Sequence, residues 1–208
     1  MSLWAIVPFK SLRGSKSRLN SALSPAERRA LSQSLLIHTL ELLVASPDLD
    51  RTLLVSRDAQ ALGLARRLGA AALAEAAPSD LNRALTQATA AARAQGATAV
   101  LILPADLPWL TGADVVRLAQ AARRPPVVVL APDRRAEGTN ALLVAPAGLL
   151  EYSFGAESYH RHLEQARHAG LPTEICDLPG LRMDLDLPED LQILRESGPG
   201  LIPRPERS

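Results

Sequence analysis

The apolar residues of this chain gather in seven short, continuous runs, and this pattern constrains the fold more than any other feature. Strands that are covered on both faces read as unbroken apolar runs, whereas strands with one solvated face alternate apolar and polar residues. The runs span residues 3–9, 52–56, 70–74, 97–103, 127–131, 141–145 and 173–176. We therefore predict a sheet that is buried between two layers of helices.

Helical patterns fill the segments between these runs. Ser24, Pro25 and Glu27 form a helix start, with a capping serine, a proline at the first position and a glutamate at the third. Further helices are expected at residues 58–68, 80–94, 111–123, 157–168 and 188–196. Strands that alternate with helices predict an α/β fold with three α/β/α layers and a Rossmann-like, mostly parallel sheet.

Length and composition limit the class of protein to which this chain can belong. The 208 residues suit one domain, which we place at residues 1–196, followed by a loose tail at residues 197–208 that is rich in Pro and Gly. A single cysteine, Cys176, excludes an internal disulfide and fits a reducing cytoplasm. The net charge of +1 argues against a nucleic-acid partner, and no apolar run is long enough to span a membrane.

The loop after the first apolar run is the first candidate site, because ligands of such sheets bind beyond the carboxyl ends of the strands. This loop carries four cations, Lys10, Arg13, Lys16 and Arg18, and contains both lysines of the chain. Cations, hydroxyls and exposed N–H groups together suit a phosphate chain, although a solvated basic loop is the alternative. The Walker A pattern is absent. Asn82 could read a base edge, but a helix start is the simpler interpretation of its segment.

Carboxylates supply the second candidate site. Asp106 follows the fourth apolar run, where it could hold Mg²⁺ against phosphates or cap a turn before the next helix, and the pattern alone leaves both open. Asp184 and Asp186 lie two residues apart in an extended segment, so their carboxylates face the same side and could bind a cation together. Glu189 and Asp190 read as structural acids in the first turn of a helix.

Hydroxyls and open N–H groups form a third candidate site in residues 137–140 and 152–158. Such groups can bind a small carboxylate, although Ser158 taken alone reads as a helix cap. His160 and His162 point about 200° apart on a helix. We therefore expect no metal shared between them, and we interpret both histidines as surface residues.

These segments together resemble a known family, the guanylyltransferases of coenzyme F-420 biosynthesis. The resemblance rests on VPFKSLRGSKSRL, LSPAERRAL, DLNRAL, LPADLPWLTGAD, EGTNALL, SFGAESYHRHL and DLDLPEDL, which occur in the family's order from near residue 6 to residue 194. It implies a nucleotide-diphospho-sugar transferase type of fold. It also implies GTP, Mg²⁺ and a three-carbon phosphorylated acid as ligands.

The resemblance also assigns roles, residue by residue. Lys16 and Arg18 should face the nucleotide phosphates and act in catalysis with Asp106. Asp106 and Asp186 should face the metal, with Asp184 as a further candidate. Thr139, Gly155 and Ser158 should hold phosphoenolpyruvate. Asn82 should lie on the guanine side, and the position of Lys10 in the basic loop adds it to the nucleotide contacts.

The implied reaction joins phosphoenolpyruvate to GTP and gives enolpyruvyl-diphospho-5′-guanosine and pyrophosphate. The same chemistry on 2-phospho-L-lactate is the nearest alternative, and 3-phosphoglycerate is a third acceptor to consider. A nucleotidyltransferase acting on a sugar phosphate or on a molybdenum cofactor is disfavoured by the GTN and FGAES segments. A non-catalytic nucleotide-binding protein is disfavoured by the presence of both Asp106 and Asp186. A homodimer is one option for the assembly.

Overall fold

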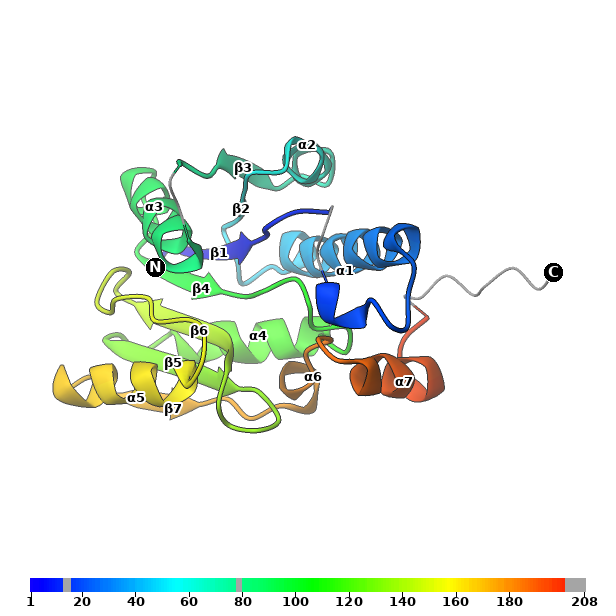
Figure 1. Ribbon diagram of the computed structural model, residues 1–208. Helices are drawn as coiled ribbons and strands as arrows, with labels where there is room; N and C mark the ends of the chain where they lie inside the picture. The colour runs from blue at the N-terminus through cyan, green and yellow to red at the C-terminus, as the bar shows by residue number, and fades with distance from the viewer. Residues whose placement is uncertain (13–15, 78–79, 201–208) are drawn as a thin grey trace.

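The centre of the protein is a seven-stranded sheet with the order β3-β2-β1-β4-β6-β5-β7 (Figure 1). The computed structural model describes residues 1–12, 16–77 and 80–200. The strands are β1 (Leu3–Pro8), β2 (Arg51–Ser56), β3 (Ala71–Ala74), β4 (Ala99–Ile102), β5 (Val127–Pro132), β6 (Thr139–Ala145) and β7 (Thr173–Ile175). Among these strands β6 alone runs antiparallel to its neighbours, β4 and β5. The predicted mostly parallel sheet is confirmed.

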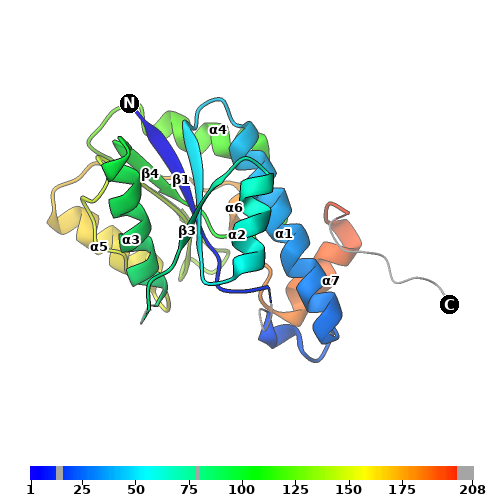
Figure 2. The same ribbon diagram turned by 90° about the horizontal axis from the view of Figure 1, so that it is seen from above.

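Helices cover both faces of the sheet, as Figure 2 shows from above. Successive residues of β1 point to opposite faces, so Leu3, Ala5 and Val7 pack with α1, α2, α4 and α6. Trp4 and Ile6 pack with α3 and α5 on the other face. The helices are α1 (Pro25–Ala45), α2 (Ala59–Arg67), α3 (Leu81–Ala94), α4 (Gly112–Ala121), α5 (Ser158–His168), α6 (Pro179–Arg182) and α7 (Pro188–Ser197), with a 3-10 turn η1 (Ser17–Leu19). The three predicted layers are therefore present.

The predicted helix starts are built by side-chain caps. Ser24 accepts a hydrogen bond from the Glu27 N–H, and the Glu27 carboxylate accepts one from the Ser24 N–H. Thr111 and Asp114 form the same reciprocal pair at the start of α4. No helix within the described ranges is long and apolar enough to cross a membrane. Residues 201–208 of the predicted tail, and Arg13 of the basic loop, lie outside the described residues.

A small apolar cluster beside the sheet positions the segments that carry the candidate site. It joins η1, the first half of α1, the extended segment before α7, and α7 itself. Leu19 and Leu185 are fully buried in this cluster, next to Arg18 on one segment and between Asp184 and Asp186 on the other. Burial of the leucine that separates the two aspartates turns both carboxylates away from the cluster, as the predicted extended segment requires.

Candidate functional site

A cleft of about 1250 Å³ opens at the carboxyl edge of the parallel strands. The loops that follow β1, β2 and β4 line it, together with the β5–β6 hairpin at residues 133–138 and the segment that leads into α5. Sites for one small ligand usually enclose about 300–1,000 Å³. The cleft therefore has room for a nucleotide and a second, smaller substrate.

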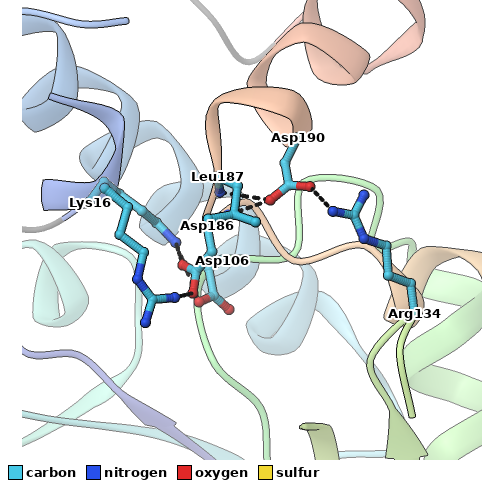
Figure 3. A network of polar contacts seen from close by, with 7 residues as sticks. Lys16, Asp106, Arg134, Asp186, Leu187 and Asp190 are labelled. Atoms are coloured by element: carbon cyan, nitrogen blue, oxygen red, sulfur yellow. Dashed lines mark hydrogen bonds and ion pairs between the residues drawn. The ribbon is translucent and has the colours of Figure 1, made fainter. Parts of the chain in front are cut away.

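Lys16, Asp106 and Asp186 meet at one end of this cleft (Figure 3). The Lys16 Nζ lies 3.4 Å from Asp106 Oδ2 and 3.1 Å from Asp186 Oδ1. Arg18 adds a contact of 3.3 Å from its guanidinium to Asp186. Burial alone would lower the pKa of Lys16, but attraction to the two carboxylates outweighs it and raises that pKa. The lysine therefore stays protonated between two anions.

Main-chain contacts bring these residues together across the sequence. The Leu185 N–H donates to the Asp106 carbonyl at 2.9 Å, which fixes the extended segment against the end of β4. Asp186 follows Leu185 directly, so its carboxylate is held close to that of Asp106. Lys16 itself has a left-handed φ of 54°, an uncommon backbone conformation that is often found at ligand-binding sites.

Asp184 lies beside the same pair of carboxylates. Burial, followed by repulsion from Asp106 and Asp186, raises the pKa of Asp184 to about 6, although a hydrogen bond with Asn140 opposes the rise. The Asn140 amide also donates to the Leu181 carbonyl at 2.8 Å. Asn140 therefore attaches the GTN segment of β6 to the segment that carries the aspartates.

The carboxylates at this end fit a hard divalent cation that also binds substrate phosphates. Within the described residues no three His, Cys, Asp or Glu side chains form a complete metal cage. Mg²⁺, however, is usually held by one or two carboxylates together with substrate phosphates and water. Asp106 and Asp186 already surround one cation, the Lys16 ammonium, so the donor set matches that requirement.

Hydroxyl groups also line the cleft. The Thr139 N–H donates to the Ser158 Oγ at 3.0 Å, and both side chains are buried. Ser158 is the first residue of α5, and Glu157 holds the capping position with no side-chain cap bond. Gly155 has a φ of 119°, which residues with a side chain rarely adopt. The structure thus brings Thr139, Gly155 and Ser158 together along one wall of the cleft.

The prediction that both histidines of α5 lie at the surface is wrong for His162. His160 is exposed, whereas His162 is 0% exposed, because residues two apart on a helix face nearly opposite sides. The Ser153 N–H donates to His162 Nε2 at 3.0 Å, so this nitrogen is the acceptor and the proton lies on Nδ1. Nδ1 lies 3.1 Å from Thr139 Oγ1 and therefore donates to it, which leaves the threonine proton free to reach a ligand.

Burial of His162 should make folding stability depend on pH. Its pKa falls from 6.5 to about 4, because burial, helped by Arg161, disfavours the charged ring. The unfolded chain then binds more protons between these values, so the free energy of unfolding should rise by about 3 kcal/mol from pH 4 to 6.5. Urea unfolding across that interval should show a shallower rise for His162→Gln. The exposed control His160→Gln should keep the wild-type slope, and equal slopes in all three proteins would contradict the assignment.

Asn82 is placed differently from the other predicted site residues. Its amide donates to the Phe154 carbonyl at 3.3 Å and accepts from the Phe154 N–H at 2.8 Å. One of these bonds would have to open before Asn82 could read guanine, so that role stays a prediction. Lys10 and Arg18 are exposed at the cleft, where a phosphate chain could reach them.

Asp58 is a site residue that the sequence alone did not reveal. It caps α2 through the Gln60 and Ala61 N–H groups. Its other oxygen accepts from the Leu12 N–H at 2.8 Å and from the Ser11 hydroxyl at 3.1 Å, so it fixes the beginning of the basic loop. Burial would raise the pKa of Asp58, but these hydrogen bonds lower it below its ordinary value. A helix cap is visible in the sequence, whereas its contact with a loop far away in the chain is not.

The fold has close relatives among solved structures. A crystal structure assigned as a nucleotide-diphospho-sugar transferase from Desulfovibrio desulfuricans matches with a TM-score of 0.77 at 16% identity, over 94% of this chain and 87% of that one. At this identity the match shows the fold alone, which is of the nucleotide-diphospho-sugar transferase type. The family model described as "Guanylyl transferase CofC like" matches residues 3–200. The chain belongs to this family.

Relatives at higher identity carry two names. The phosphoenolpyruvate guanylyltransferase of Rubrobacter xylanophilus is 43% identical over 208 residues, which cover all of both chains. The 2-phospho-L-lactate guanylyltransferase of Methanothermobacter thermautotrophicus is 36% identical, over 92% of this chain and 83% of its own. Both names describe transfer of a guanylyl group to a three-carbon phosphorylated acid.

Proposed function

We propose that this protein transfers the guanylyl group of GTP to phosphoenolpyruvate, giving enolpyruvyl-diphospho-5′-guanosine and pyrophosphate. The observation that carries the proposal is the arrangement of the cleft. Lys16, Asp106 and Asp186 gather at one end, which suits a triphosphate and a cation. Uncharged hydroxyls and N–H groups at Thr139, Gly155 and Ser158 line another part of the cleft, which suits a small acid. The names of the relatives support the same pair of substrates.

The chemistry needs no basic residue to create the nucleophile. A phosphate monoester has a second pKa near 6 and is largely dianionic at neutral pH. An oxygen of the acceptor phosphate attacks the α-phosphorus of GTP, the bond to the bridging oxygen breaks, and pyrophosphate leaves with that electron pair. The main barrier is repulsion between two anions, so the work of the protein is to position the substrates and neutralise charge.

The charged residues of the cleft supply this neutralisation. Mg²⁺ held by Asp106 and Asp186 would offset negative charge on the phosphate oxygens. Lys16, whose ammonium lies between these carboxylates, would then turn it to the phosphates of GTP. Arg18 and Lys10 lie at the same opening of the cleft and would hold the departing pyrophosphate. Asp184 would stand beside the metal as a further ligand.

The choice of acceptor is tested by a pyrophosphate-release assay with GTP and each of three acids. Phosphoenolpyruvate should give the highest kcat/KM, ahead of 2-phospho-L-lactate and 3-phosphoglycerate. Preference for 2-phospho-L-lactate would establish the second activity, which the 36% identical relative favours. Failure of every acid to release pyrophosphate would leave only a non-catalytic nucleotide-binding protein and would overturn the proposal.

Thr139→Val should weaken binding of the acid selectively. Valine keeps the shape of threonine but removes the hydroxyl whose proton is free to reach a ligand. A hydrogen bond to a charged group contributes about 1.5–3 kcal/mol, so the KM for phosphoenolpyruvate should rise by about tenfold or more. Steady-state kinetics should show a much smaller change in the KM for GTP.

The matched variant is Thr139→Ser, which restores the hydroxyl and should recover most of the affinity for the acid. Ser158→Ala is a second probe of the same wall, although it also removes the acceptor for the Thr139 N–H and should lower stability. An equal rise in the KM values for the acid and for GTP would contradict the acceptor-site assignment.

A further inference from the structure

Asp190 is a buried carboxylate that contacts the candidate metal site through the main chain (Figure 3). Its side chain is 4% exposed. One oxygen accepts from the Asp186 N–H at 3.0 Å and from the Leu187 N–H at 2.7 Å. The other lies 2.7 Å from an Arg134 nitrogen, which comes from the β5–β6 hairpin. Three segments of the chain therefore meet at one carboxylate.

Helix capping alone does not account for this arrangement. Glu27 in α1 and Asp114 in α4 occupy the same position in their helices and accept the capping N–H. Glu27 is exposed and Asp114 is half-buried, so a capping acid needs no burial. Asp190 is buried, which costs free energy unless the charge is paired and hydrogen-bonded. Asp190 also binds a second N–H, that of Asp186, which lies outside the helix.

The second N–H fixes the position of Asp186. The carboxylate of Asp186 is 41% exposed, and its contacts with Lys16 and Arg18 are made to long, flexible side chains. Its backbone, in contrast, is held on both sides, by the Leu185 bond to Asp106 and by the bond to Asp190. The distance between the carboxylates of Asp106 and Asp186 therefore depends on these two main-chain bonds.

Arg134 connects this position to the β5–β6 hairpin, which also lines the cleft. The hairpin that carries it is braced internally, because Asp133 accepts from the Arg135 and Glu137 N–H groups and donates its own N–H to the Gly138 carbonyl. The hairpin leads directly into Thr139, the first residue of β6. The ion pair between Arg134 and Asp190 thus ties the acceptor wall to the segment that carries Asp186.

We propose that Asp190 is a positioning residue that sets Asp186 for divalent-cation binding, and that Arg134 maintains it by neutralising its buried charge. This inference rests on the proposed function, in which Asp106 and Asp186 hold the cation. The affinity for the cation then depends on two residues that do not touch it. Loss of a residue that orients a metal ligand typically lowers metal affinity or activity by about 10- to 100-fold.

The test is a titration of the protein with Mn²⁺ alone, in which the electron paramagnetic resonance signal reports the concentration of free Mn²⁺. Asp190→Asn should raise the Kd for Mn²⁺ by about tenfold or more. Glu189→Gln, an exposed acid in the same helical turn, should bind Mn²⁺ like the wild type. The Tm of each variant is measured in parallel. A lower Tm with an unchanged Kd would make Asp190 merely structural and overturn the proposal.

A second variant covers the case in which Asp190→Asn does not fold. Arg134→Met removes the ion pair but keeps the bonds from Asp190 to the main chain, and it should raise the Kd for Mn²⁺ by about threefold or more. The control is Arg135→Met, an exposed neighbour in the same hairpin. Arg134 and Asp190 should act as one unit. The double variant Arg134→Met with Asp190→Asn should therefore lose less Mn²⁺ affinity than the two single-variant losses multiplied together. Wild-type Mn²⁺ affinity in Arg134→Met would overturn the proposed role of Arg134 in maintaining Asp190.

Two reference measurements separate this proposal from the proposed function. Asp106→Asn should abolish Mn²⁺ binding, and equal binding by it and the wild type would remove the metal assignment together with this inference. Pyrophosphate release by the wild type tests the transfer reaction separately. Wild-type release together with normal Mn²⁺ binding by Asp190→Asn would refute only the positioning role.

Discussion

Asp106→Asn should release pyrophosphate about 100- to 1000-fold more slowly than the wild type, the range found when a preorganised electrostatic contact is removed from an active site. The amide keeps the shape of the carboxylate but not the charge, so the proposed cation would lose one of its carboxylate ligands. Asp186 still pairs with Lys16, and Leu185 still bonds to the main-chain carbonyl of residue 106. The Tm should therefore stay close to that of the wild type. Pyrophosphate release measured over a range of Mg²⁺ concentrations checks the activity, and thermal unfolding checks the Tm.

Asp177→Asn is the matched control for this change. Asp177 is a partly exposed carboxylate that pairs with Arg182 rather than with the residues of the cleft. Surface pairs contribute little to stability, so this variant should keep its fold and its activity. Full activity in Asp106→Asn, or an equal loss in Asp177→Asn, would contradict the role given to Asp106.

Lys16→Met should lower kcat by about 100- to 1000-fold, because the half-buried cation that we propose for the phosphates is lost from the transition state. The same change should strengthen binding of Mn²⁺ to the protein without nucleotide. Lys16 occupies the space between Asp106 and Asp186, so its removal leaves two carboxylates without their cation. The attraction between the Lys16 ammonium and one carboxylate corresponds to a few kcal/mol at an effective dielectric constant near 20. Tenfold tighter binding of Mn²⁺ needs only about 1.4 kcal/mol, so loss of this competing charge is sufficient to produce it.

Opposite changes in catalysis and metal binding distinguish Lys16 from a residue with a general structural role. Misfolding would weaken both properties, whereas loss of a competing ammonium weakens only catalysis. Lys10→Met provides the comparison, because Lys10 is exposed at the cleft and should cost much less activity. Weaker Mn²⁺ binding in Lys16→Met, or an equal loss of activity in both lysine variants, would contradict the assignment.

All strands and the longer helices were predictable because local rules determine them, whereas the short η1 and α6 were not predicted. Apolar runs identified all of the strands from β1 to β7, and the caps at Ser24 and Thr111 identified the helix starts they occupy. The direction of β6 is not encoded in its apolar run, which reads alike in both directions. The length of the connection does predict this direction. Only residues 133–138 separate β5 from β6, and a connection this short cannot form a parallel crossover.

The sequence indicated several residues that the structure brings to the cleft, but it did not indicate Asp58 or the contacts that connect these residues. The basic loop and Asp106 could be placed because β1 and β4, which they follow, end at one edge of the sheet. His162 was misplaced because its neighbour His160 reads the same in sequence, and only the packing of α5 decides which of them is buried. The contact of Arg134 with Asp190 joins residues far apart in the chain, and no local pattern marks such a pair.

The central claim is that the acceptor phosphate attacks the α-phosphorus of GTP in this cleft. The most direct measurement is mass spectrometry of the nucleotides formed when the wild-type protein is mixed with GTP, Mg²⁺ and phosphoenolpyruvate. The prediction is a new species with the mass of GTP plus phosphoenolpyruvate minus pyrophosphate, formed in step with pyrophosphate and absent without the acid. Unchanged GTP, or GDP or GMP in place of this species, would contradict the claim.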